Sequence, residues 1–529
     1  MRDFHFPGRS AALACNAMVA TSHPLATEAA LHVLRDGGSA MDAGIAGSAV
    51  MAVVEPQMTG IGGDCFALVS AANDAGRVTA FNGSGRSASA ASAEQLRAEG
   101  LTEVPVDSIH SVTLPGAIDG WFKLHARYGR LDMERLLRPA IALARDGYPV
   151  HARVAWDWRQ SEQLLASREA SRAVFMPGGA CPAVGDVHRQ EALAQTLERV
   201  AKQGPAAFYT GEIAAAMLRT LRANGGVHCE DDFAAVSGDF VDPISTEYRG
   251  RRVHQVPPNN QGMTALVMLN LLSGFDLSAM PMMSADRMHL EIEVARLAFA
   301  VRNRHITDPH ALQARPEDLL SEAYTSELRS RINMERAMRD PGPVEVRKSD
   351  TVYMTVVDKD MNAVSFINSI FHGFGSGLLC PETGVLFQNR GHSFSLDPDH
   401  PNVLAPSKRP MHTIMPGMVT EDGKPVLSFG VMGGDYQPIG QARVVSALYD
   451  HGMELQAALD LPRLFTLASG VDIERSLPPE VMYGLMEKGH ALQVVDEPIG
   501  GAQAIAIDHA RGVLIGASDP RKDGYAAGF

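Results

Sequence analysis

The chain has 529 residues, of which 45% are apolar, and its formal net charge is −14. A chain of this kind can bury a large core and has room for about two to four domains. Its acidic balance argues against binding to nucleic acid or to an anionic membrane surface, because phosphate groups attract a basic face. We therefore expect a globular protein whose partners are neither nucleic acid nor membrane.

The cysteines and histidines give no indication of a metal or another cofactor. The five cysteines are odd in number and widely spaced, with no Cys-x-x-Cys pair. This pattern suggests reduced thiols, without a disulfide framework or a zinc site. The 19 histidines include no His-Glu-x-x-His or similar motif. We expect neither a metal nor a cofactor.

The sequence shows no targeting segment. The first residues, Met1 to Pro7, lack the apolar core of a signal peptide. No window reaches the roughly 18 apolar residues that a membrane-spanning helix requires. We therefore predict a cytoplasmic location.

The first half of the chain is helix-rich in pattern. Apolar residues recur at helical spacing in several segments, and glycines follow the first two of them as helix ends. We predict helices over residues 27–35, 131–146, 191–203, 211–224 and 285–302.

The second half changes to strand-like patterns. Residues 351–358 and 363–369 form a predicted hairpin, joined by a turn at 359–362. Further apolar strands are predicted at 414–419, 425–429 and 502–507. Two sheets between layers of helices would accommodate this order of elements.

The sharpest break in the chain precedes Thr351. A polar segment with two prolines, residues 336–350, leads directly into the strand pattern that Thr351 opens. A threonine hydroxyl needs a neighbouring base to act as a nucleophile, and cleavage of the Asp350–Thr351 bond would supply one in the freed α-amine. Taken alone, the segment favours a threonine that simply begins a strand, where β-branched residues are common.

Short motifs along the whole chain bear on this choice. They occur as Val19-Ala20-Thr21-Ser22-His23-Pro24, Gly37-Gly38-Ser39-Ala40, Glu55-Pro56, Gly60-Ile61-Gly62-Gly63, Leu114-Pro115-Gly116, Tyr248-Arg249-Gly250, Lys408-Arg409-Pro410, Gly433-Gly434 and Gly516-Ala517-Ser518-Asp519-Pro520. In this order they resemble the γ-glutamyltransferases (glutathione hydrolases), a superfamily of N-terminal-nucleophile hydrolases. The resemblance implies a four-layer αββα sandwich of mixed α/β (α+β) class. It also implies self-cleavage into a large subunit, 1–350, and a small subunit, 351–529, which remain one intertwined unit.

The resemblance also implies the catalytic residues. Thr351 matches the residue that cleaves the precursor and then attacks the substrate. Ser369 stands where the family carries a second threonine that orients the nucleophile. Gly433 and Gly434 match the pair whose backbone N–H groups form an oxyanion hole, a role that a diglycine after a strand can fill.

Four positions depart from the contacts that the family uses for the head group of an amino acid. Asn82 replaces an arginine, Phe371 an asparagine and Ser393 an aspartate, and the His412-Thr413 pair replaces two serines. A γ-glutamyl substrate would lose charged partners at each end of its head group, so we expect it to bind poorly.

The remaining cationic and polar residues predict a different substrate. Arg86, Arg390, His412 and Thr413 would offer a carboxylate site without a partner for an ammonium group. This combination resembles the branch of the superfamily that includes oxamate amidohydrolase and the related cephalosporin acylases. We predict hydrolysis of a small carboxylate-bearing amide, with a dimer of the processed heterodimer left open. The alternatives are a glutathione hydrolase or transpeptidase and an unprocessed, non-catalytic binding or scaffold protein.

Overall fold

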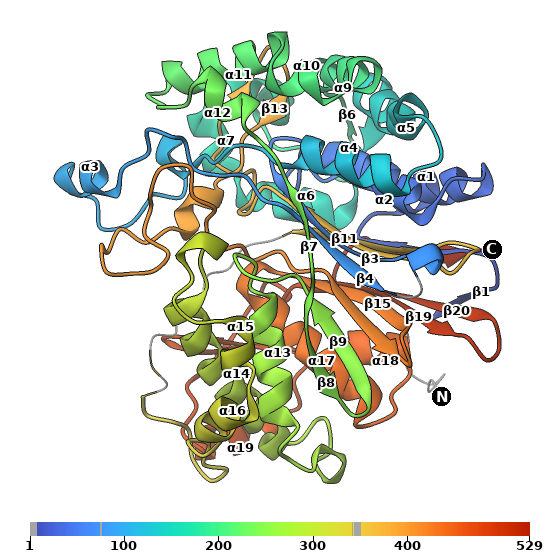
Figure 1. Ribbon diagram of the computed structural model, residues 1–529, viewed down its shortest axis with the longest axis vertical. Helices are drawn as coiled ribbons and strands as arrows, with labels where there is room; N and C mark the ends of the chain where they lie inside the picture. The colour runs from blue at the N-terminus through green and yellow to red at the C-terminus, as the bar shows by residue number, and fades with distance from the viewer. Residues whose placement is uncertain (1–7, 75–76, 341, 343–350) are drawn as a thin grey trace.

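Two β-sheets lie face to face in the middle of the molecule and helices cover their outer sides (Figure 1). The computed structural model describes residues 8–74, 77–340, 342 and 351–529. Asp350 and most of the predicted processing segment lie outside the described residues. The four layers are the αββα sandwich that the family resemblance implied.

The first sheet is built from both halves of the chain. Its strand order is β21-β2-β10-β11-β3-β4-β7. The strands are β21 (Tyr525–Gly528), β2 (Met18–Thr21), β10 (Val352–Val357), β11 (Ala363–Ser369), β3 (Asp64–Ser70), β4 (Val78–Gly83) and β7 (Asp239–Val241). Strands β10 and β11 at its centre are buried along their whole length, which suits strands covered on both faces.

The second sheet is also shared between the two halves. Its strand order is β1-β20-β19-β15-β14-β9-β8. The strands are β1 (Ala12–Ala14), β20 (Val513–Ser518), β19 (Gly501–Asp508), β15 (Lys424–Met432), β14 (Gly417–Glu421), β9 (Arg251–Gln255) and β8 (Ile244–Tyr248). Residues before and after position 351 therefore meet in both sheets, so the two predicted subunits form one interlocked unit.

The helices fall into two groups, one on each outer face (Figure 1). On the first sheet lie α1 (Pro24–Arg35), α2 (Ala40–Val54) and α4 (Ala117–Tyr128), and α5 (Met133–Asp146) and α9 (Glu191–Gln203) pack outside them. On the second sheet lie α13 (Gly262–Leu272), α17 (Gln437–Tyr449) and α18 (Leu455–Asp460), and α14 (Ala285–His305) and α19 (Pro479–Glu487) pack outside them. The remaining helices are α3 (Ala93–Ala98), α6 (Ala152–Gln160), α7 (Glu162–Ser167), α8 (Glu169–Phe175), α10 (Pro205–Tyr209), α11 (Glu212–Ala223), α12 (Glu230–Ala234), α15 (Pro316–Leu319) and α16 (Glu322–Arg329).

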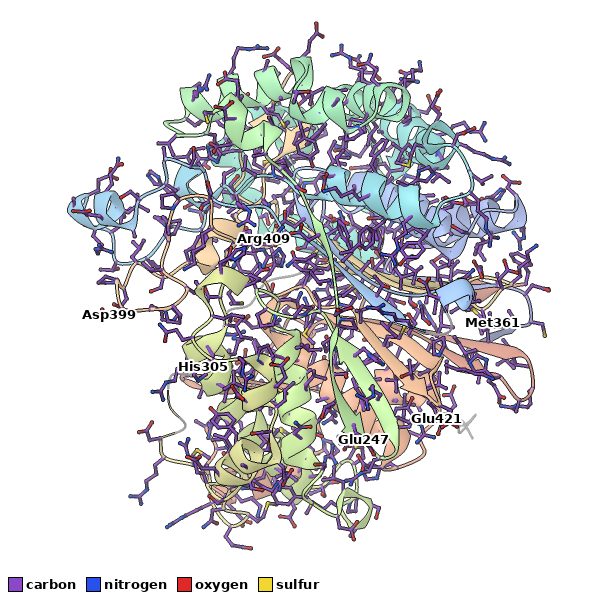
Figure 2. All side chains as sticks on the ribbon, in the orientation of Figure 1. Glu247, His305, Met361, Asp399, Arg409 and Glu421 are labelled. Atoms are coloured by element: carbon purple, nitrogen blue, oxygen red, sulfur yellow. The ribbon has the colours of Figure 1, made fainter. Side chains whose placement is uncertain are left out.

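Three apolar layers hold the sandwich together, and side chains fill the space between the backbone layers (Figure 2). The middle layer joins the two sheets and includes Phe66, Tyr353, Met418 and Ile505, each completely buried. The outer layers join each sheet to its helices. Within the described ranges, no helix is both long and apolar enough to cross a membrane.

The predicted helices and the hairpin are confirmed with small shifts of their ends, but one strand was partly misplaced. The strand predicted at 414–419 pairs with its neighbouring strands only from Gly417 onward. Before Gly417 the backbone amides form hydrogen bonds outside the sheet. The His412 amide donates to the Asn259 carbonyl, and the Met415 amide donates to the Gln437 side chain. These contacts hold residues 412–415 beside the site.

A buried histidine at the start of α1 gives the fold a predicted sensitivity to acid. The Nδ1 atom of His23 caps the helix by accepting from the Leu25 amide at 3.3 Å. Burial, assisted by the neighbouring His151, lowers the pKa of His23 to about 3. The unfolded chain therefore binds the proton more readily, and stability is lost as the pH falls through the unfolded value of 6.5 towards 3.

We expect His23→Asn to keep the cap and to weaken this acid sensitivity, because asparagine is a good N-cap that does not titrate. By linkage, His23 should account for about 2 kcal/mol of stability lost between pH 7 and pH 5. Midpoints of thermal unfolding at the two pH values measure the effect. His32→Asn on the exposed side of the same helix is the control. An equal pH dependence in both variants would contradict this role.

Candidate active site

The Thr351 hydroxyl is placed by the central hairpin of the first sheet. Antiparallel pairing sets Val352 opposite Asn368, so Thr351 meets Ser369 at the end of β11. The Thr351 Oγ1 donates to the Ser369 Oγ at 3.0 Å, and Thr351 is only 1% exposed. The Ser369 Oγ also accepts from the Phe371 amide at 2.9 Å. These contacts hold the threonine hydroxyl in one direction.

Strand β15 of the second sheet brings Gly433 to the same place. The Thr355 Oγ1 donates to the Ser428 Oγ at 2.6 Å, and the ring of Tyr353 lies against Gly430. Alternate residues of a strand point to the same face. Moving back by two residues along β10, from Thr355 to Tyr353, therefore moves the contact forward by two residues along β15, from Ser428 to Gly430. Continuing this alternation by one step, we infer that Thr351 lies near Met432, the residue before Gly433.

The turn after β15 depends on glycine. Gly433 has φ of 114° and Gly434 has φ of 56°, and a Cβ on Gly433 would lie 2.9 Å from the Cα of Gly500. Successive residues in this conformation can direct backbone N–H groups into one concavity, a geometry that binds anions. The Gly434 carbonyl faces the other way and accepts from the Gln261 side chain at 3.0 Å.

A buried arginine lies beside these groups. Arg390 begins a 3₁₀ turn, Arg390–Ser393, and its side chain is completely buried. Its Nη1 donates to the Thr413 Oγ1 at 2.8 Å, and its guanidinium carbon lies 3.9 Å from the centre of the Phe371 ring. Its Nε and Nη2 have no hydrogen-bond partner among the described residues. Two nitrogens of this buried cation, which together carry three N–H groups, therefore have no partner within the described ranges.

Arg390 forms no ion pair with an acid within the described part of the chain. Burial lowers the pKa of Arg390 to about 9, while Asp64 and Asp435 oppose the shift. Asp435 forms a 2.6 Å ion pair with Arg302, whereas Asp64 is hydrogen-bonded to His412. The charge of Asp64 therefore favours the charged form of Arg390 from a distance, without direct contact. A buried cation without a directly paired anion is costly.

Hydrogen bonds connect Arg390 to the diglycine turn, and a cation–π contact followed by two hydrogen bonds connects it to Thr351. The guanidinium group of Arg390 lies over the ring of Phe371, and the Phe371 amide donates to the Ser369 Oγ. On the other side, the Gln261 Nε2 donates to the carbonyls of both Thr413 and Gly434. The cation, the threonine hydroxyl and the glycine turn therefore belong to one connected arrangement.

The other residues predicted to bind substrate differ in their availability. The Ser393 Oγ is buried without a hydrogen-bond partner in the described part of the chain, one 3₁₀ turn from Arg390. Asn82 is engaged with Asn259 at 2.9 Å and with Ser84. Arg86 is directed away, to an ion pair with Asp308 at 3.2 Å, and its side chain is 33% exposed. Arg390 and Thr413 thus come together, Ser393 ends the 3₁₀ turn that Arg390 begins, and Arg86 does not join them.

His412 forms part of the wall of the site. Its Nε2 donates to the Asp64 Oδ2 at 3.0 Å, and both side chains are completely buried. Burial, with the nearby Arg390, lowers the pKa of His412 to about 3, against the influence of Asp64. The ring is therefore neutral at pH 7 and is already occupied by Asp64.

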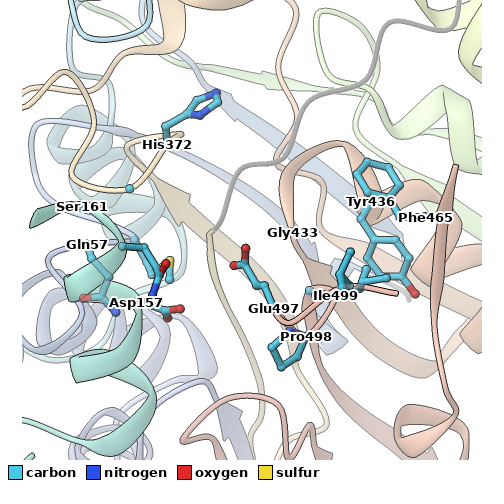
Figure 3. Close-up of a pocket in the computed structure, with 15 residues that line it drawn as sticks. Gln57, Asp157, Ser161, His372, Gly433, Tyr436, Phe465, Glu497, Pro498 and Ile499 are labelled. Carbon is cyan, nitrogen blue, oxygen red and sulfur yellow. The ribbon is translucent and has the colours of Figure 1, made fainter. Parts of the chain in front are cut away.

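A cavity of about 190 Å³ opens next to Gly433 (Figure 3). One wall carries Gln57, Ser161 and His372, and the opposite wall carries Tyr436 and Phe465. The sequence had not indicated these lining residues. Gln57 directly follows the Glu55-Pro56 motif, which is the only local signal for any of them.

The four-layer fold is that of the N-terminal-nucleophile hydrolases, and this defines the class of the protein. Comparisons with known proteins agree. The gamma-glutamyltranspeptidase family model matches residues 26–529. The chain is 37% identical to the glutathione hydrolase-like YwrD proenzyme of Bacillus subtilis strain 168, over 97% of this chain and 98% of that protein. It is 34% identical to the oxamate amidohydrolase proenzyme of Klebsiella pneumoniae, over 98% and 100% of the two chains.

A solved structure gives the same result. The crystal structure of cephalosporin acylase from Bacillus halodurans superimposes with a TM-score of 0.93 and 39% identity, covering 100% of this chain and 99% of that one. The chain belongs to the gamma-glutamyltranspeptidase family and is an amidohydrolase of that family.

Asp64 is a buried hydrogen-bond acceptor in the wall of the site, and we expect its replacement to destabilise the protein. Its Oδ1 accepts from the amides of Gly85 and Gly116 and from Gln388, and its Oδ2 accepts from His412. Asp64→Ala should lower the free energy of unfolding by about 3–5 kcal/mol, because four buried donors lose their acceptor.

Urea unfolding of the two variants Asp64→Ala and Asp242→Ala checks this expectation. Asp242 pairs with Arg77 on the surface, where both side chains are mostly exposed. Its removal should cost less than about 1 kcal/mol. Equal effects of the two substitutions would show that the Asp64 network does not support the site.

Proposed function

We propose that the protein is a self-processing amidohydrolase that cleaves the amide bond of a small carboxylate-bearing substrate through an acyl-enzyme on Thr351. The observation that carries the proposal is the buried Arg390, whose Nε and Nη2 lack a hydrogen-bond partner among the described residues and which stacks on Phe371, two residues after the Ser369 of the Thr351–Ser369 hydroxyl pair. Relatives whose names describe proenzymes support the processing step.

Maturation would begin at the Asp350–Thr351 bond. The Thr351 Oγ attacks the carbonyl carbon of residue 350, and the acyl group moves from nitrogen to oxygen to form an ester. Water then hydrolyses this ester, which releases a carboxylate on residue 350 and a free α-amine on Thr351. Ser369 favours this attack because its hydroxyl already holds the Thr351 Oγ in one direction.

The same hydroxyl would then attack the substrate. The freed α-amine takes the proton of the Thr351 Oγ as the oxygen adds to the amide carbon. The resulting oxyanion is stabilised by backbone N–H groups of the Gly433-Gly434 turn, a contribution of roughly 10²–10³ in rate for a single donor. The amine product leaves with the proton, and water hydrolyses the acyl-enzyme.

The substrate class follows from the charges around this centre. The Nε and Nη2 of Arg390, with the Ser393 hydroxyl, can take a carboxylate. Phe371 stands where an ammonium-binding residue is expected in γ-glutamyl enzymes, and its ring stacks on the cation. A carboxylate without a neighbouring ammonium suits this site. The oxamate amidohydrolase proenzyme of Klebsiella pneumoniae is a relative named for a substrate of this chemistry.

Glutathione hydrolysis or transpeptidation is the second candidate. A relative that carries the name glutathione hydrolase, from Escherichia coli K12, is 31% identical to this chain over 97% of its length. Turnover of γ-glutamyl-4-nitroanilide at a rate above that of glutaryl-4-nitroanilide would favour this alternative.

Replacement of Thr351 should abolish processing. We expect Thr351→Ala to remain one chain, because the attacking hydroxyl is gone, while the wild type yields fragments 1–350 and 351–529. Denaturing electrophoresis and mass analysis of the new N-terminus measure this. Thr355→Ala removes a buried hydroxyl from the same strand and should still be cleaved. Cleavage of Thr351→Ala at an unchanged rate would refute the assignment.

Replacement of Arg390 should change specificity more than catalysis. In Arg390→Met we expect kcat/KM for glutaryl-4-nitroanilide to fall by roughly 30- to 10³-fold, since a buried carboxylate loses its charged partner. Processing and hydrolysis of the uncharged butyryl-4-nitroanilide should change little. Arg86→Met is the matched control, with little effect expected on either substrate. An equal loss for charged and uncharged substrates would remove Arg390 from substrate recognition.

A further inference from the structure

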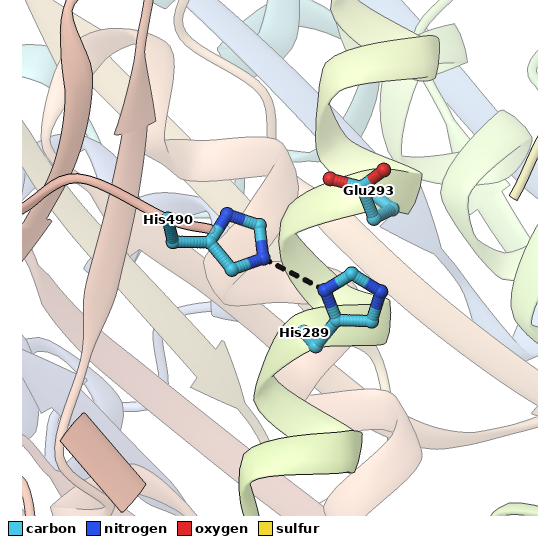
Figure 4. A group of neighbouring side chains, drawn as sticks. All are labelled: His289, Glu293 and His490. Carbon is cyan, nitrogen blue, oxygen red and sulfur yellow. Dashed lines mark hydrogen bonds between the residues drawn. The ribbon is translucent and has the colours of Figure 1, made fainter. Parts of the chain in front are cut away.

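A second group of buried polar side chains lies far from Thr351, on the outer side of the second sheet (Figures 1 and 4). His289 and Glu293 are one turn apart on α14, and His490 follows α19. The exposed fractions of the three residues are 0%, 0% and 3%. One ligand atom from each lies within 4.8 Å of the others.

The hydrogen bonds of the two histidines define where their lone pairs point. The His289 Nε2 donates to the Asn333 carbonyl at 2.8 Å, so the Nδ1 of this ring carries a lone pair. That Nδ1 lies 2.7 Å from the His490 Nε2 (Figure 4). Without an ion, the His490 Nε2 must donate its hydrogen to the His289 Nδ1. The His490 Nδ1 is then a buried acceptor with no hydrogen-bond partner in the described ranges.

The hydrogen bonding of His289 is that of a metal-binding histidine. A metal-binding histidine usually donates its second N–H to a carbonyl or carboxylate, which fixes the ring and its tautomer. The Asn333 carbonyl accepts this hydrogen bond from His289 and leaves the lone pair of its Nδ1 directed at His490.

Glu293 supplies an anion next to the two rings. Its Oε1 accepts from Arg296 at 3.1 Å and its Oε2 accepts from the Met338 amide at 2.8 Å. Each carboxylate oxygen can accept at two positions, so these contacts leave room for a further ligand bond. Two imidazoles and one carboxylate favour a transition metal such as Zn²⁺, and not Mg²⁺ or Ca²⁺, which prefer oxygen donors.

We propose that His289 Nδ1, His490 Nε2 and the Glu293 carboxylate bind one divalent transition-metal ion of the zinc type, with water as the fourth ligand. Metal–nitrogen bonds of about 2.0–2.1 Å require the two rings to separate slightly, by roughly 0.5 Å. The ion would join α14 to the segment after α19, and through Asn333 and Met338 it would hold residues 333–338. If the Asp350–Thr351 bond is cleaved, as proposed above, the ion also bridges the two fragments.

Metal titration of the full-length wild-type protein, after treatment with a chelator, tests the site. We expect one Zn²⁺ per chain by calorimetry, a rise in the unfolding temperature, and visible absorption of a tetrahedral Co²⁺ complex. Mg²⁺ and Ca²⁺ should neither bind to this site nor raise the unfolding temperature. His289→Gln and His490→Gln should each weaken Zn²⁺ binding by roughly 100-fold or more. His254→Gln, which replaces a buried histidine bonded to Thr420, should bind like the wild type.

Three results would overturn the proposal. They are no Zn²⁺ or Co²⁺ binding by the wild type, equal binding by all three variants, and hydrogen-bonded rings without metal in a zinc-soaked crystal. If the ligand variants fail to fold, X-ray absorption at the zinc edge of the wild-type protein decides the matter. Two imidazoles are expected, and their absence contradicts the site. The same titration on uncleaved Thr351→Ala should give equal affinity, so failure of processing does not affect this test.

Discussion

The antiparallel pairing of β10 with β11 determines where the Thr351 hydroxyl points, and the rest of the site is arranged around that hydroxyl. The pairing sets Thr351 opposite Ser369 at the end of the hairpin. Both strands are buried along their length and are bonded to β2 and β3 on their outer sides. A reacting group on such a rigid element keeps its direction better than one on a loop.

The electrostatics of the site have one dominant feature, the buried cation of Arg390, which has no direct ion pair within the described part of the chain. Asp64 and Asp435 are hydrogen-bonded to His412 and paired with Arg302, respectively. The Phe371 ring covers one face of Arg390. Such a buried charge costs stability, and we propose that an anionic group of the substrate is its partner. Hydrogen bonds through Gln261 also join the Thr413 segment to the diglycine turn, so the proposed substrate contact and the proposed oxyanion site are linked.

Much of this could be predicted from the sequence where the signal was local. Helix α9 was predicted with its observed ends, because its apolar period is regular and a glycine follows it. The hairpin of β10 and β11 was confirmed as well. Strands β2, β3 and β4 were not predicted, since strands buried on both faces show no alternation of apolar and polar residues.

The same distinction between local and distant signals applies to the site residues. The pairing of Thr351 with Ser369 follows from a short hairpin, and Arg390 was predicted as a pocket cation. The direction of Arg86 depends on Asp308, more than two hundred residues away in the chain, and nothing in its local sequence indicates that contact. The cluster of His289, Glu293 and His490 escaped detection for the same reason, because His490 lies far from the helix that carries the other two.

We propose that Thr351 carries the acyl group during turnover. Rapid acid quenching of the mature enzyme with excess glutaryl-4-nitroanilide, followed by mass spectrometry of its peptides, tests this proposal. We expect a glutaryl mass increment on the peptide that begins at Thr351, with none on the peptide that contains Ser369. An adduct on another residue, or a Thr351 peptide that still continues into residue 350, would contradict it.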